Sequence, residues 1–95
     1  MAAYMIAEVD VTDPKGFEEY RKLVPETIAK YKGKVLVRGG ATETVEGNWS
    51  PKRLVMLEFE SMKQAKEWYY SREYTAAKEI RFRSANTNLV FVEGV

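Results

Sequence analysis

The sequence predicts an α+β fold of the ferredoxin-like type, with the element order β-α-β-β-α-β. Two observations predict it. Four short runs have the apolar content or two-residue alternation of strands, at residues 3–11, 34–45, 53–60 and 87–93. Two stretches with three- and four-residue apolar spacing separate the first run from the second and the third from the fourth. Right-handed crossovers then give a four-stranded antiparallel sheet with helices on one face.

The first strand, residues 3–11, leads directly into the first helix. Asp13 suits the N-cap, and Pro14 suits the first helical position. Pro25 removes an amide donor, so we expect it to kink or restart the helix. Gly33 is expected to end it. The apolar stripe of this helix consists of Phe17, Tyr20, Val24, Ile28 and Tyr31.

The middle of the chain is predicted to be two strands joined by a polar turn. Residues 34–45 form the second strand, in which Gly39-Gly40 indicates a bulge or a close approach of backbone. Residues 46–51 form the turn, and residues 53–60 form the third strand.

The second helical region begins at Ser61, because Ser61 with Gln64 makes a capping box. Ser71 starts a further helical segment that reaches about residue 83, and residues 87–93 form the last strand. The apolar residues at helical spacing in this region are Met62, Ala65, Trp68, Tyr69, Tyr74, Ala77 and Ile80.

The composition is that of a globular chain, with 45% hydrophobic and 31% charged residues. Because 15 basic residues face 14 acidic ones, no net charge attracts nucleic acid or an anionic membrane. The basic residues between Arg72 and Arg83 are interleaved with acids, and this pattern indicates a solvated helix face. We find neither a signal peptide nor an apolar span of membrane length. We therefore expect one cytoplasmic domain over residues 1–95.

Histidine and cysteine are both absent from the sequence. The lack of cysteine excludes disulfides and thiolate chemistry. The lack of histidine removes the usual general base at neutral pH, the usual haem ligand and the commonest metal ligand. A serine triad of the usual form is therefore impossible, and we expect neither a metal nor another cofactor.

Both faces of the predicted sheet are apolar, although helices cover only one. By alternation the first face carries Met5, Ala7, Val9, Val35, Val37, Val55, Leu57, Phe59, Val90 and Val92. The second face carries Tyr4, Ile6, Leu36, Leu54, Met56, Leu89 and Phe91. Monomers rarely expose an apolar patch of this size. We therefore expect a homodimer in which two sheets pack face to face, a dimeric α/β barrel.

Four charged residues fall on the second face by the same alternation: Arg38, Glu8, Glu58 and Glu93. Buried charges should be paired. Arg38 either pairs with Glu8 or Glu58, within one chain or across the dimer, and fixes the register, or it binds an anionic ligand with its planar fork. Trp49, on the turn, either anchors its own loop or closes a ligand pocket.

The candidate ligand-binding residues are Arg38, Trp49, Glu58, Trp68, Tyr69, Tyr74 and Arg81. Aromatic walls with a few cationic or hydroxyl groups suit a planar or carboxylated small molecule. In this interpretation Tyr69 or Tyr74 donates a proton and Glu58 accepts one. Alternatively, the aromatic residues at helical spacing are core or dimer contacts.

Several segments together resemble the family catalogued as domain of unknown function 1330. They are Arg38-Gly39-Gly40, residues 46–53, 55–59, 65–69 and 71–74, and the resemblance extends over essentially the whole chain. It implies a dimeric α+β barrel but no activity. The wider superfamily includes cofactor-independent monooxygenases, haem-degrading enzymes and muconolactone-isomerase-like proteins, and a shared fold does not transfer their chemistry.

Three functions stay open from the sequence. The chain is a cofactor-independent enzyme that acts on a small aromatic or acidic metabolite, a non-catalytic dimer that binds such a ligand, or a structural dimer whose polar residues only set the register.

Overall fold

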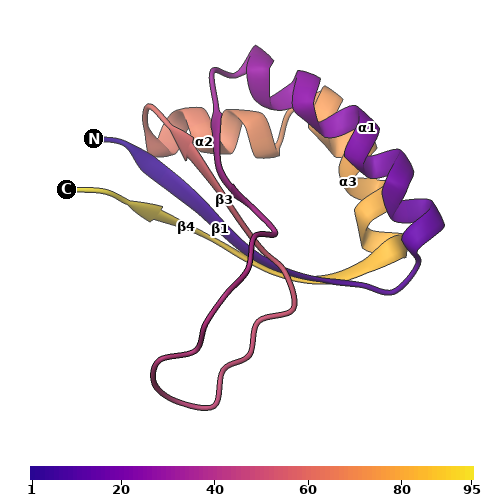
Figure 1. Ribbon diagram of the computed structural model, residues 1–95. Helices are drawn as coiled ribbons and strands as arrows, with labels where there is room; N and C mark the ends of the chain where they lie inside the picture. The colour runs from indigo at the N-terminus through magenta and orange to yellow at the C-terminus, as the bar shows by residue number, and fades with distance from the viewer.

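The computed structural model describes all residues, 1–95. Its elements are β1 (Ala3–Val11), α1 (Pro14–Lys30), β2 (Lys34–Arg38), β3 (Leu54–Phe59), α2 (Met62–Tyr69), α3 (Arg72–Ser84) and β4 (Ala85–Glu93). The strands form one antiparallel sheet in the order β2-β3-β1-β4, and the helices lie over one of its faces (Figure 1). The predicted ferredoxin-like α+β fold is therefore confirmed, with the second helical region divided into α2 and α3.

Helix α1 is continuous through Pro25, so the predicted restart does not occur. Its end differs in detail from the prediction. The Gly33 amide donates to the Ile28 carbonyl at 2.9 Å, but the left-handed residue is Lys32, with φ 60°. Gly33 is required for a different reason, because a Cβ there would lie 2.7 Å from Cε1 of Phe59.

Serine caps fix the starts of α2 and α3. The Gln64 amide donates to Oγ of Ser61, and the Tyr74 amide donates to Oγ of Ser71, each at 3.1 Å. The side chain of Gln64 does not close the predicted capping box. It donates instead to the Tyr31 carbonyl at 2.8 Å, which ties α2 to the end of α1.

Cross-strand pairing decides which residues of β4 face the helices. Phe91 lies opposite Met5, and Leu89 lies opposite Ala7, on the buried side of the sheet. The alternation of β4 is therefore reversed from the prediction, because the pattern within one strand does not tell which set of residues faces the core. The residues that were assigned to the wrong face are Leu89, Val90, Phe91, Val92 and Glu93.

Strand β2 contains an irregularity between Val35 and Val37. Val35 lies opposite Leu57, whereas Arg38 lies opposite Val55. Because a β-bulge shifts the alternation by one residue, Arg38 lies on the helix side of the sheet and Val37 on the outer side. The prediction that Arg38 belongs to the outer face is wrong for this reason.

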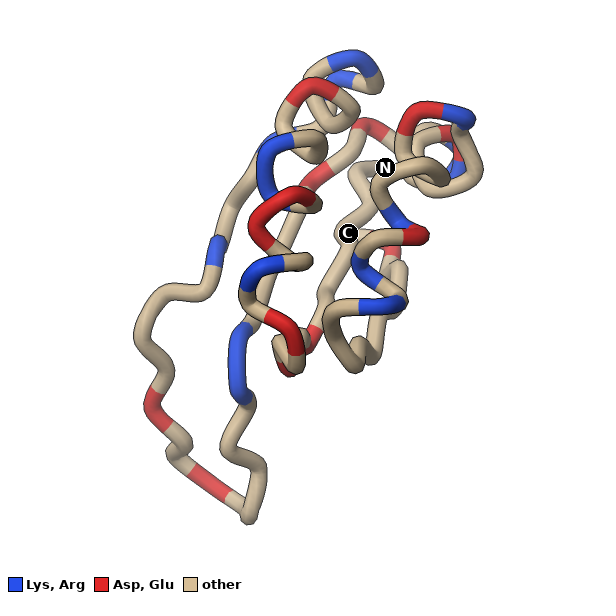
Figure 2. Tube along the Cα trace, turned by 90° about the vertical axis from the view of Figure 1, so that its right-hand side faces the viewer, with Lys and Arg blue, Asp and Glu red and all other residues tan.

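The core lies between the sheet and the helices, and α1 packs beside α3 (Figure 1). The loop 39–53 between β2 and β3 extends from the sheet away from the helices. Figure 2 shows its acidic residues toward the far end and its basic residues near the body of the protein. None of the helices combines the length and the apolar character that crossing a membrane requires.

Candidate functional site

A cavity of about 250 Å³ lies between α1 and the helix side of the sheet. It is smaller than the roughly 300–1,000 Å³ of pockets for drug-sized ligands, so it suits a compound of about one ring. Its charged lining residues are Arg21, Arg38, Arg53 and Arg81, and no Asp or Glu contributes to the lining. Most of the other lining residues are apolar or aromatic. The cavity therefore combines a positive charge with a hydrophobic wall.

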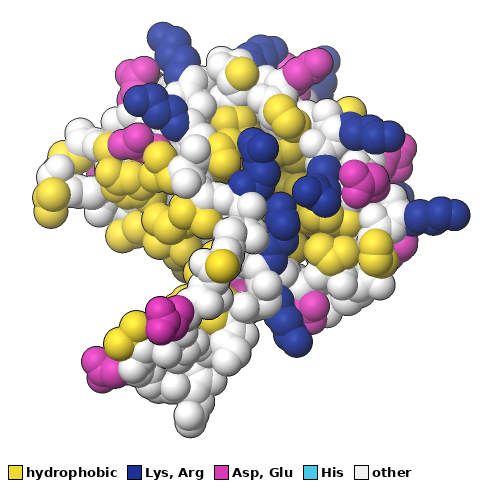
Figure 3. All heavy atoms as spheres, in the orientation of Figure 1, with side chains coloured by type: hydrophobic (Ala, Val, Ile, Leu, Met, Phe, Trp, Pro, Cys, Tyr) yellow, Lys and Arg dark blue, Asp and Glu magenta, His cyan; other side chains and the backbone are white.

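Three of the arginines lie near the opening of the cavity. Arg21 comes from α1, Arg38 ends β2, and Arg53 precedes β3. Burial, with repulsion from Arg21 and Arg38, lowers the pKa of Arg53, and its Nε atom is buried without a hydrogen-bond partner. Only Arg21 has an acidic neighbour, the exposed Glu18 at 3.7 Å. Figure 3 shows basic side chains gathered in the middle of this face between apolar groups.

Gly39 allows the Arg53 side chain to pack directly against the backbone. Its φ of 65° lies in the left-handed region, and a Cβ at this position would collide with the Arg53 guanidinium. Its amide donates to the Leu54 carbonyl at 2.7 Å, so the foot of the loop is hydrogen-bonded to the start of β3. This glycine therefore leaves the space that the Arg53 guanidinium occupies.

Arg81, from α3, is the most buried of the four, with 3% of its surface exposed. Its Nε atom has no hydrogen-bond partner, and neither of the two ion pairs in the protein includes it. The predicted solvated face is therefore wrong for Arg81, and also for the buried Lys78. A buried guanidinium without a carboxylate is energetically costly.

Two tyrosines lie beside Arg81. The hydroxyls of Tyr20 and Tyr74 are hydrogen-bonded at 2.8 Å, and both side chains line the cavity. Burial raises the pKa of both phenols, and the proximity of Tyr74 raises that of Tyr20 further, while the positive charge of Arg81 acts in the opposite direction. Both phenols therefore stay protonated at neutral pH. One hydroxyl donates to the other, so the pair has one remaining proton that it can donate to a ligand oxygen.

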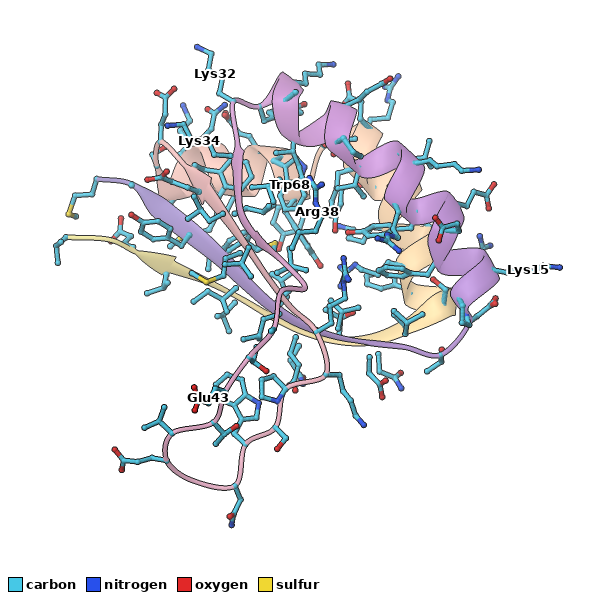
Figure 4. All side chains as sticks on the ribbon, viewed as in Figure 1. Lys15, Lys32, Lys34, Arg38, Glu43 and Trp68 are labelled. Atoms are coloured by element: carbon cyan, nitrogen blue, oxygen red, sulfur yellow. The ribbon has the colours of Figure 1, made fainter.

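Trp68 forms part of the inner wall, and Figure 4 labels it close to Arg38 between α1 and the sheet. Its ring lies 4.0 Å from that of Tyr74 and 5.3 Å from that of Phe59, measured between centroids. Its Nε1 donates to Oγ1 of Thr27 at 3.0 Å. The indole is thus fixed by α1, and with 1% of its surface exposed it is packed between its aromatic neighbours.

The structure brings together four of the seven candidate residues, Arg38, Trp68, Tyr74 and Arg81. Trp49 and Glu58 do not line the cavity. Trp49 is 58% exposed on the loop, and its Nε1 donates to Glu8 at 3.4 Å. Glu58 faces the outer side, where it accepts a hydrogen bond from Tyr4 at 3.4 Å. Neither carboxylate pairs with Arg38.

Tyr69 lies beside Arg81 in a second, more open recess and not in the cavity between α1 and the sheet. Nζ of Lys78 donates to the Tyr69 carbonyl at 3.0 Å and lies 3.8 Å from the centre of its ring. These contacts give Tyr69 a packing role at the junction of α2 and α3.

Sequence reasoning missed Tyr20, Arg21 and Arg53 as site residues. Tyr20 was recognised only as part of the apolar stripe of α1. Arg53 had a usable signal, because alternation places it on the same face as Val55 and Leu57. No group of three or more His, Cys, Asp or Glu side chains is close enough together to hold a metal ion.

Solved structures with the same fold are similar to this chain over nearly its whole length. A protein of unknown function from Rhodopseudomonas palustris has 16% identity and a TM-score of 0.78, over 99% of this chain and 82% of that one. SnoaB, a cofactor-independent oxygenase from Streptomyces nogalater, has 7% identity and a TM-score of 0.68, over 99% and 93%. A dimeric protein of unknown function and ferredoxin-like fold from Bacteroides fragilis has 15% identity and a TM-score of 0.65, over 98% and 96%.

These identities are low enough that the similarity concerns the fold alone. No curated protein matches the sequence. The model of the family described as Domain of unknown function (DUF1330) matches residues 2–95. The chain therefore belongs to the DUF1330 family.

Proposed function

We propose that this protein binds a small aromatic or acidic metabolite in the cavity between α1 and the sheet. The observation that carries the proposal is the presence of four arginines in a lining without any acidic residue. Arginine forks bind carboxylates through paired, charge-assisted hydrogen bonds. Trp68 and the apolar residues around it supply a wall against which a ring can pack.

The same proposal includes a homodimer that covers the outer face of the sheet. This face carries Ile6, Val37, Leu54, Met56, Val90 and Val92. Val90 is 57% exposed in the single chain, and burying such groups favours association. The neighbour from Bacteroides fragilis is described as dimeric. A second copy that packs sheet against sheet is the simplest cover.

A second candidate function is catalysis without a cofactor. The hydroxyl pair of Tyr20 and Tyr74 supports it, because protonated phenols inside an apolar cavity can stabilise an oxyanion that develops on the ligand. In this reading Arg38 orients the anion and Tyr74 donates the proton. SnoaB, which shares the fold, is described as a cofactor-independent oxygenase. A purely structural role is disfavoured, since Arg81 is buried and has no acidic partner.

Binding is tested with benzoate as the probe. A Trp49→Phe variant leaves Trp68 as the remaining tryptophan, so that its fluorescence reports on the cavity. We expect saturable binding, weakened about tenfold or more by Arg38→Met, because a charge-assisted hydrogen bond contributes about 1.5–3 kcal/mol. Lys34→Met is the matched control, since it removes a charge from the same strand outside the cavity.

The outcomes separate the functions. Binding that is equal in the Arg38 and Lys34 variants overturns the ligand proposal. So does the absence of saturable binding of benzoate and of the other ring acids tested below. Chromatography then measures whether a bound compound disappears over time in aerated buffer. A loss that Tyr74→Phe abolishes favours the enzyme over the non-catalytic dimer.

A further inference from the structure

The cationic groups of the cavity occupy two positions. Arg38 and Arg53 lie on the β2–β3 side of the cavity. Burial lowers the pKa of Arg53, and the positive charge of Arg21, on α1, repels that of Arg53 and so lowers its pKa further. Burial raises the pKa of Tyr20 and Tyr74 whereas the positive charge of Arg81 acts to lower it, so Arg81 lies near both phenols. It also borders the recess beside β4. In the sheet order β2-β3-β1-β4, β1 separates β3 from β4. Neighbouring strands are about 4.8 Å apart, so β3 and β4, with β1 between them, lie about 10 Å apart.

The inner position needs an anion that the chain does not supply. Arg81 has 3% of its surface exposed, and its Nε is buried without a hydrogen-bond partner. The phenols of Tyr20 and Tyr74, which lie beside it in the cavity, are uncharged. Buried charges in proteins are normally paired or bound to an ion.

The outer position, at Arg21, Arg38 and Arg53, also has hydrogen-bond donors and positive charge that the chain satisfies only in part. Three guanidiniums meet there, and repulsion among them is part of what disfavours the charge on Arg53. The only acidic neighbour, Glu18, lies on the exposed side of Arg21. A ligand carboxylate at this position would relieve the repulsion and supply the missing acceptor for Arg53.

We propose that the ligand is a dianion, a single-ring compound with an acidic group at each of two opposite positions, one held by Arg38 and Arg53 and the other by Arg81. This inference rests on the proposed binding function and specifies its ligand. The second acidic group is either another carboxylate or an acidic hydroxyl. The Tyr20–Tyr74 pair donates its one free hydroxyl proton to it, and the ring packs against the apolar lining between the two groups.

The test compares benzoate, terephthalate and 4-hydroxybenzoate by isothermal titration calorimetry on the full chain. Terephthalate is expected to bind about tenfold or more tightly than benzoate, because it engages a second charge-assisted contact. A dicarboxylate ligand predicts terephthalate as the tightest probe, and a ligand with an acidic hydroxyl predicts 4-hydroxybenzoate at alkaline pH.

Arg81→Met should bring the preference for terephthalate over benzoate down to about one, by weakening terephthalate much more than benzoate. Arg38→Met should weaken both probes. Arg83→Met is the control, because Arg83 lies on the same helix but is exposed and does not line the cavity. Arg81→Lys keeps the charge and should retain a preference of a few-fold.

The melting temperature gives a second readout. Without ligand, Arg81→Met should melt at a higher temperature than the wild type, because the unpaired buried charge is gone. With terephthalate the wild type should gain more stability than the variant. Equal affinity of the wild type for the three probes, or a preference that survives in both Arg81 variants, overturns the dianion inference. If Arg38→Met still weakens benzoate, the proposed binding function stands; if no ring acid binds, both fail.

Discussion

Single residues at the centre of this fold respond to alkali. Tyr20 and Tyr74 share a hydrogen bond inside the cavity, and burial raises the pKa of both phenols. The folded protein therefore holds protons that the unfolded chain loses above about pH 10. Because the unfolded state then binds fewer protons, the free energy of unfolding is unaffected below that pH and falls as the pH rises above it.

The residue-scale prediction concerns Tyr20→Phe. The wild type should lose free energy of unfolding between about pH 8 and pH 11, and the variant should lose less, because one of its two buried phenols is gone. Each unit of pKa difference corresponds to about 1.4 kcal/mol. Urea unfolding at both pH values measures the effect. Tyr70→Phe, at an exposed position, should keep the slope of the wild type; if Tyr20→Phe keeps it too, the buried pair does not govern the alkaline response.

Arg38 shows what residue patterns reveal and what they miss. Its position inside a strand marks it as unusual from the sequence alone. The face on which it lies depends on the irregularity between Val35 and Val37, which arises from pairing with β3. Arg81 is similar, since interleaved acids indicated a solvated face, but packing of α3 beside α1 buries it. Neither outcome is encoded in the local pattern.

At the scale of elements, the loop 39–53 provides a matched pair of glycines. Gly39 and Gly47 both have positive φ, 65° and 84°. A Cβ at Gly39 would strike the Arg53 guanidinium, whereas a Cβ at Gly47 would meet open space. The two positions therefore carry the same backbone requirement, but only one of them contacts the site.

Replacement of either glycine by alanine should cost about 1–2 kcal/mol of stability if the left-handed conformation is kept. Gly39→Ala should in addition weaken benzoate binding several-fold, because it displaces Arg53. Urea unfolding measures the first effect and titration calorimetry the second. A Gly39→Ala protein that binds benzoate as tightly as Gly47→Ala would show that Arg53 does not contact the ligand.

The starts of the helices were more predictable from the sequence than the lengths of the strands. Asp13, Ser61 and Ser71 were identified as caps from the sequence, and each accepts a backbone hydrogen bond at the start of a helix. The second strand was predicted to be too long, because it ends at Arg38 and not at residue 45. Capping is a local interaction that short sequence patterns contain. Strand length is not, since it depends on which residues of another strand are within reach.

For the whole molecule, the outer face of the sheet sets the expected assembly. Val90→Lys places a charge in the middle of the apolar outer face, opposite Ile6. It should convert the proposed dimer to a monomer, as sedimentation velocity at micromolar concentration would show. Leu23→Lys, at an exposed position on α1, should leave the dimer intact. A wild-type protein that sediments as a monomer would remove the dimer from the proposal.

The general architecture could be predicted from the sequence, but the cavity could not. Alternation, caps and connection lengths are sufficient for a ferredoxin-like sheet with helices on one face. The cavity depends on how α1 lies across the sheet, which brings Arg21 from α1 near Arg53, thirty-two positions further along the chain. Such proximity results from the packing of whole elements and leaves no trace in neighbouring residues.

The way in which the two ends of the loop 39–53 are fixed has a consequence for labelling the protein. Arg38 is positioned by the ladder between β2 and β3, and the backbone of Arg53 is held by β1, because its carbonyl accepts a hydrogen bond from the Val9 amide. We therefore expect that an inserted peptide, a dye or a surface tether at the tip of the loop would not displace the guanidinium groups of Arg38 and Arg53. The tip is therefore a suitable site for labelling.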